Sequence, residues 1–141
     1  MIRKNVYVTF DERDRSSYEK VAAWNKNPYL GFSFIGSTAA EQGRGSAVKT
    51  KNDILSGLAH SCAVLVLVGE GSNDTSPDCL EIGAINWQSF AIARSIERGC
   101  PLVCVKLDDA CAAPVAVRNA EVAWAAAFTL ESVMGTLAKL S

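Results

Sequence analysis

The stretch "CAVLVLVG", residues 62–69, contains an uninterrupted run of aliphatic residues between a cysteine and a glycine. A strand with one wet face alternates apolar and polar residues, and this stretch does not alternate. It therefore predicts a central parallel strand that is covered on both faces. A second stretch of the same character, "PLVCVKL" at residues 101–107, predicts another buried strand in the same sheet.

Helical and strand-like patterns alternate on either side of these two strands. Strands are expected at residues 5–10 and 31–36, with a last one within residues 120–126. The four expected helices run from about Ser17 to Lys26 after a Ser16/Glu19 capping box, from about Ala47 to His60, from Ser76 as an N-cap, and from Thr129 as an N-cap.

This order of elements predicts an α/β fold with a flavodoxin-like, doubly wound and mostly parallel sheet. Its 141 residues fit a single domain that spans residues 1–141. Such sheets bind ligands beyond the carboxyl ends of their strands, at the point where the strand order reverses. The loops after Phe10, Ile35, Gly69 and Leu107 are therefore the expected site.

Composition excludes several classes of function. The 49% of hydrophobic residues can build a core, and a net charge of −1 creates no field that would attract nucleic acid or a membrane surface. No apolar run approaches the ~20 residues of a membrane span, and the N-terminus does not resemble a signal peptide, so we expect a cytoplasmic protein. Five cysteines and one histidine form no recognisable metal set, and most of the cysteines are expected to be buried.

Familiar catalytic motifs are missing. The sequence contains no GxGxxG fingerprint, no GxxxxGKS/T loop and no GxSxG elbow, so nothing indicates a dinucleotide fold, a P-loop or a serine hydrolase. The single histidine, His60, is interpreted as a helix-end residue.

Three segments, taken in order, resemble TIR-like (Toll/interleukin-1 receptor-like) domains. "VYVTFDERD" resembles the family's FxSFxxxD opening, "NPYLGFSFIGS" resembles its second strand, and "KTKNDILSGLAHSCAVLVLVG" resembles the segment that ends in its third strand. The similarity covers roughly residues 5–107 and is closest to the short bacterial TIR-like proteins of Thoeris antiphage defence.

The resemblance implies a flavodoxin-like fold and cleavage of the bond between nicotinamide and ribose in NAD, which is then a substrate and not a cofactor. In Thoeris members this chemistry makes a cyclic ADP-ribose signal for an effector protein, and TIR-like enzymes commonly self-associate. The essential residue of those enzymes is a glutamate on the helix after the third strand, in a pattern like W-x-x-x-E-I.

Two alignments compete for that glutamate. Counting forward from Gly69 reaches Glu81, whereas counting back from Pro101 pairs Trp87 with the family tryptophan and leaves Ala91 at the glutamate position. On one lengthened helix, positions 81 and 91 are about 15 Å apart along the axis and roughly 80° apart in direction, so only one faces a pocket. Glu81 lies near the carboxyl end of the third strand, which favours it as the catalytic carboxylate. Such a carboxylate would stabilise an oxocarbenium-like ribose. Alternatively, Glu81 is an ordinary charge that favours a helix N-terminus.

The other candidate residues also have two interpretations. Phe10 and Asp14 either line a nicotinamide pocket or serve as a core residue and a turn residue. Arg13 and Arg44 either bind a pyrophosphate or are ordinary exposed arginines, and Ser37 either binds a ribose hydroxyl or closes a turn.

Three functions remain open. The first is a TIR-like NAD-processing protein that uses Glu81. The second is a degenerate TIR-like module that binds a nucleotide or a protein without catalysis, which Ala91 favours, as does Ile35 at a position where many relatives have an acid. The third is an enzyme that transfers N-glycosyl groups of nucleosides, because such chemistry also needs a carboxylate.

Overall fold

The computed structural model describes residues 3–36 and 46–140. Within them, five strands form one sheet with the order β2-β1-β3-β4-β5, and every neighbouring pair is parallel. The strands are β1 (Lys4–Thr9), β2 (Phe32–Gly36), β3 (Ala63–Val68), β4 (Leu102–Lys106) and β5 (Ala123–Trp124). This arrangement confirms the predicted α/β class and is compatible with the flavodoxin-like order, whose reversal point lies between β1 and β3.

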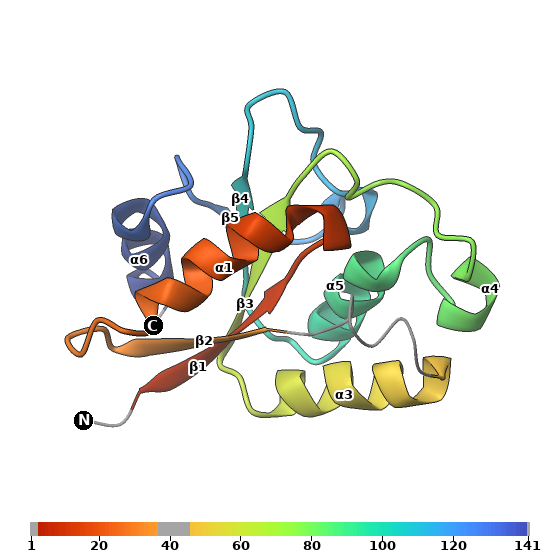
Figure 1. Ribbon diagram of the computed structural model, residues 1–141, viewed down its shortest axis with the longest axis horizontal. Helices are drawn as coiled ribbons and strands as arrows, with labels where there is room; N and C mark the ends of the chain where they lie inside the picture. The colour runs from red at the N-terminus through yellow and green to blue at the C-terminus, as the bar shows by residue number, and fades with distance from the viewer. Residues whose placement is uncertain (1–2, 37–45, 141) are drawn as a thin grey trace.

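Helices cover both faces of the sheet (Figure 1). The helices α1 and α6 lie on one face, α3 and α5 lie on the other, and α4 projects beyond α5. The helical segments are α1 (Arg15–Trp24), α3 (Ala47–Ala59), α4 (Cys79–Ile82), α5 (Trp87–Glu97), α6 (Leu130–Ala138) and the short 3-10 turns η1 (Glu12–Asp14) and η2 (Val115–Val117). No helix in the described ranges has both the length and the apolar composition needed to cross a membrane.

The strand β3 supplies side chains to two separate cores. Leu65 and Leu67 pack with α1 and α6, while Val64 and Val66 pack with α3 and α5. Every residue of β3 is buried, as the missing alternation predicted. Since burial of one such side chain contributes about 1.5–3 kcal/mol, β3 is a major source of the folding free energy.

The expected capping box at Ser16 is wrong. The helix α1 begins at Arg15, and the side chain of Asp11 caps the preceding turn η1 by accepting a hydrogen bond from the Arg13 backbone N–H. Because η1 leads directly into α1, the helix starts before Ser16 can act as a cap. Thr129 is confirmed as the N-cap of α6. The bounds of α3 are confirmed to within one residue.

The expected single long helix after Ser76 is also wrong. The chain forms the four-residue helix α4, stops at Gly83 and begins α5 at Trp87. Gly83 has φ of 79°, a left-handed conformation that costs other residues energy and is a common helix end. Asn86 then caps α5 by accepting a hydrogen bond from the Ser89 N–H at 2.8 Å. Positions 81 and 91 therefore lie on two different helices.

We expect Gly83→Ala to lower the free energy of unfolding by about 1–2 kcal/mol, because a left-handed backbone conformation is unfavourable for alanine. A β-carbon there would meet no atom within 4 Å, so the loss is conformational and not steric. Urea denaturation followed by circular dichroism measures it.

Gly135→Ala is the matched control. It lies in α6, where a β-carbon also has open space, and alanine is favoured there by about 1 kcal/mol. A stabilising Gly83→Ala substitution would contradict the helix end described above.

Candidate functional site

A cleft of about 270 Å³ lies beyond the carboxyl ends of β1, β3 and β4. It thus opens at the strand ends around the reversal point, where ligands of this sheet type bind. Three of the four loops predicted to form the site contribute to it; the loop after β2 falls largely outside the described residues. The lining residues are Arg13, Asp14, Gly69, Glu70, Gly71, Leu107, Asp108 and Cys111.

Asp14 is the carboxylate held most closely within the cleft wall. Its Oδ2 atom is buried and has no hydrogen-bond partner among the described residues. Burial is the main cause that raises the pKa of the Asp14 carboxyl, and the nearby Asp11 carboxylate adds to the rise. Arg13 opposes this rise, whereas Glu70 adds a smaller amount. The Oδ2 atom of Asp14 is therefore a buried acceptor that receives no hydrogen bond from the described part of the chain.

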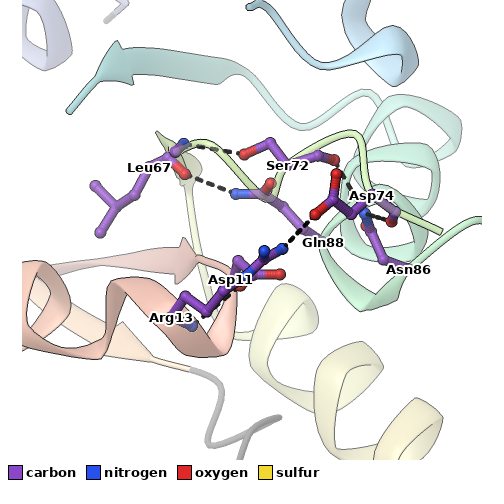
Figure 2. A network of polar contacts seen from close by, with 8 residues as sticks. Asp11, Arg13, Leu67, Ser72, Asp74, Asn86 and Gln88 are labelled. Atoms are coloured by element: carbon purple, nitrogen blue, oxygen red, sulfur yellow. Dashed lines mark hydrogen bonds and ion pairs between the residues drawn. The ribbon is translucent and has the colours of Figure 1, made fainter. Parts of the chain in front are cut away.

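Arg13 joins the loop after β1 to the loop after β3. Its guanidinium donates to Asp11 at 2.9 Å and to Asp74 at 2.8 Å. Figure 2 shows Arg13 and Asp11 on one side and Asp74 on the other. These hydrogen bonds raise the pKa of Arg13 above its ordinary value, so the group stays charged. Two of its five N–H donors are used in these bonds.

Two glycines allow these side chains to lie against the loop after β3. A β-carbon at position 69 would overlap the Asp14 carboxylate, and one at position 71 would overlap the Arg13 guanidinium. The same loop is closed by the buried Ser72 hydroxyl, which accepts a hydrogen bond from the Gly69 N–H at 3.0 Å. The close approach explains why both positions lack a side chain.

Two amides of the α5 region support the strand ends (Figure 2). The Gln88 side chain donates to the Leu67 carbonyl of β3 at 2.8 Å, as Figure 2 shows. It also donates to the Thr9 carbonyl of β1 at 3.2 Å. Asn86 donates to the carbonyls of Ser72 and Asp74 in the loop after β3. The start of α5 thereby holds both strands and the loop at the reversal point.

The catalytic candidate Glu81 does not line this cleft. It is exposed on α4, and its neighbour Leu80 is 95% exposed. Ala91, at the competing position, is 1% exposed and belongs to the core beneath α5. Neither position therefore brings a carboxylate to the lining of the cleft.

The remaining predicted residues separate into three groups. Arg13 and Asp14 meet in the cleft. Phe10 is 8% exposed, stacks on Tyr18 with ring centroids 4.4 Å apart and packs in the core on the α1 side. Ser37 and Arg44 lie outside the described residues.

Several residues of the site were not singled out from the sequence. Glu70 and Asp108 follow the ends of β3 and β4, so the rule that ligands bind at carboxyl ends was the available signal. Gln88 gave no signal, because an amide on a helix is usually exposed, and only the packed fold shows its contact with β1 and β3.

A larger groove, of about 1130 Å³, lies at the opposite end of the sheet. It is lined by residues at the starts of β4 and β5, including Cys100, Pro101 and Trp124. Ligands of this sheet type bind at the carboxyl ends where the strand order reverses, between β1 and β3, so the smaller cleft is the candidate site. Within the described ranges, no group of three or more histidine, cysteine, aspartate or glutamate side chains is arranged to hold a metal ion.

Comparison of the sequence with models of known protein families and with curated proteins finds no match. The chemistry of the cleft is therefore interpreted from its own geometry.

We expect the stability of the wild type, relative to Asp14→Asn, to fall as the pH rises from about 3 to neutral. The raised pKa of Asp14 means that the folded state binds its proton more tightly than the unfolded state. This stability is present at a pH below the ordinary pKa and is lost as the pH rises through the higher folded value. Urea denaturation of both proteins at several pH values measures the difference. A difference in the free energy of unfolding that is constant across this range, or that changes in the opposite direction, would contradict the burial of Asp14.

We expect Gln88→Met to lower the free energy of unfolding by about 1–3 kcal/mol, because two buried carbonyls lose their donor while the side-chain volume changes little. Ser95→Ala is the control: the Ser95 hydroxyl donates to the Ala91 carbonyl, which keeps its helical partner. Chemical denaturation should show a clearly smaller loss for Ser95→Ala; equal losses would argue against a bracing role for Gln88.

Proposed function

We propose that this chain is a TIR-like module that binds a nucleotide or nucleoside moiety in the cleft at the reversal point and does not use Glu81 to break the nicotinamide bond. The observation that carries this proposal is the separation of Glu81 from the cleft. The exposed residue lies on α4, while the cleft is formed by the loops after β1, β3 and β4.

The bounds of α5 support the alignment that lacks a glutamate. Trp87 is the first residue of α5, so the family pattern W-x-x-x-E-I begins where this helix begins. That alignment puts Ala91 at the glutamate position, and Ala91 packs in the core. A glutamate there would have to bury its carboxylate among apolar side chains.

The charges of the cleft favour a ligand that brings hydrogen-bond donors. Among the described residues, its lining contains the carboxylates of Asp14, Glu70 and Asp108 and the guanidinium of Arg13, which binds Asp11 and Asp74. Such a lining repels a free phosphate and suits the hydroxyls of a ribose. Its volume of about 270 Å³ lies just below the ~300–1,000 Å³ of typical ligand pockets, which favours a nucleoside moiety over a whole dinucleotide.

Asp14 favours a second candidate, cleavage of an N-glycosidic bond in a nucleoside or in NAD. It is the partly buried carboxylate of the cleft, and burial raises its pKa, which is the direction expected of a carboxyl group that acts as an acid or base. If this candidate is correct, substitution of Asp14 abolishes the activity and substitution of Glu81 does not. A setting in antiphage defence, with an effector protein reached through a nucleotide signal, is supported by the resemblance alone.

Thermal shift with NAD, ADP-ribose, adenosine and free adenine tests the binding proposal. We expect adenosine to stabilise the wild type by about 2.7 kcal/mol at a concentration 100 times its dissociation constant, and adenine to have little effect. NAD and ADP-ribose should stabilise it less, because the acidic lining repels their phosphates. Glu81→Gln should bind as the wild type does, whereas Asp14→Asn should lose most of the stabilisation.

Chromatography of NAD and nucleosides after incubation with each protein separates the alternatives. We expect no consumption of NAD that depends on Glu81. Turnover by the wild type that disappears in Glu81→Gln but persists in Asp14→Asn would overturn the proposal. Turnover that disappears only in Asp14→Asn would select the second candidate.

A further inference from the structure

Two cysteines lie at the amino ends of adjacent strands, at the opposite end of the sheet from the cleft. Cys62 immediately precedes β3, and Cys100 lies two residues before β4. In the parallel pairing of these strands Val64 lies opposite Leu102. Continued two residues toward the amino ends, beyond the bounds of the two strands, the same register would place Cys62 beside Cys100.

The backbone spacing suits a disulfide. Neighbouring strands lie about 4.8 Å apart, and cysteines joined by a disulfide usually have Cα atoms about 4.4–6.8 Å apart. Hydrogen bonds hold both positions: the Cys62 N–H donates to the Asn5 carbonyl at 2.9 Å, and the Cys100 N–H donates to the Ser95 carbonyl at 2.9 Å. Closure of a bridge thus requires side-chain rotation and little movement of the chain.

Exposure distinguishes this pair from the two buried cysteines. Cys62 is exposed and Cys100 is half-buried, while Cys104 and Cys111 are buried, so the expectation that most cysteines are buried is wrong. Burial raises the pKa of Cys104 to about 12, which keeps this thiol protonated and unreactive. The pKa of Cys100 is raised by burial and, secondarily, by the charge of Cys62, consistent with their closeness.

We propose that Cys62 and Cys100 form a dithiol site that hydrogen peroxide converts to a disulfide. The Cys62 thiolate attacks one peroxide oxygen, the O–O bond breaks, and the sulfur becomes a sulfenic acid while hydroxide leaves and takes a proton to form water. The Cys100 sulfur then attacks the Cys62 sulfur, the S–O bond breaks, and the thiol proton and the hydroxyl group leave as a second water. Two thiols are oxidised by two electrons, and one peroxide is reduced to two waters.

The bridge would act on the amino end of the sheet. It would link the start of β3 to the start of β4 and close a loop that contains α4 and α5. Cys100 also lines the larger groove, so oxidation changes the wall of that groove and leaves the cleft residues untouched. This inference does not depend on the proposed ligand.

Peptide mapping of the wild type tests the proposal without any substitution. The protein is treated with hydrogen peroxide at low concentration, the remaining thiols are alkylated, and the chain is cut with trypsin and a glutamate-specific protease. Cleavage after Glu70 separates Cys62 from Cys79. We expect a peptide pair joined through Cys62 and Cys100, an intact mass lower by two hydrogens, and restoration by dithiothreitol.

Three variants complete the test. The linked pair should disappear in Cys62→Ser and in Cys100→Ser, which also distinguishes Cys100 from Cys104 in the same peptide, and it should persist in Cys79→Ser. Cys62 oxidised to sulfinic acid while Cys100 remains alkylated would overturn the proposal. A bridge that involves Cys79 or a second copy of the chain would overturn it too.

Discussion

The structure depends on the double burial of β3 at the centre of a parallel sheet. The strand is hydrogen-bonded to β1 on one edge and to β4 on the other, and its side chains enter cores on both faces. A parallel sheet needs crossover connections, and these supply the helices that cover it. The order of the strands then reverses beside β3, which leaves the carboxyl ends of β1, β3 and β4 free to form the cleft.

The residues that line the cleft come from the loops that follow those strand ends. The loop after β1 provides Arg13 and Asp14, and the loop after β3 accepts both of them because Gly69 and Gly71 have no side chains. Gln88 braces the ends of β1 and β3 from below. The fold thus holds a half-buried carboxylate against the loop after β3. The same arrangement leaves Glu81 on a separate helix, outside the site.

The two ends of the sheet have different chemistry. The carboxyl end concentrates Asp14, Glu70 and Asp108 around one arginine, whereas the amino end places two thiols beside a larger groove. Because the ends are separated by the length of the strands, oxidation at one end and ligand binding at the other involve different residues.

The amino-acid sequence by itself determined the class of the fold, since an unalternating apolar run such as residues 62–69 is stable only when both faces of a strand are covered. It also located the loops of the site, because carboxyl ends of parallel strands meet at one edge. Only the tertiary structure showed where the helix after β3 stops. A glycine such as Gly83 can lie within a helix or end one, and here it ends α4 before Asn86 caps α5. The break between α4 and α5 separates Glu81 from the cleft, places Ala91 in the core and turns Gln88 inward. Counting residues from Gly69 or from Pro101 could not reveal this break. Contacts between distant residues, such as Arg13 with Asp74, arise only when the packed loops come together.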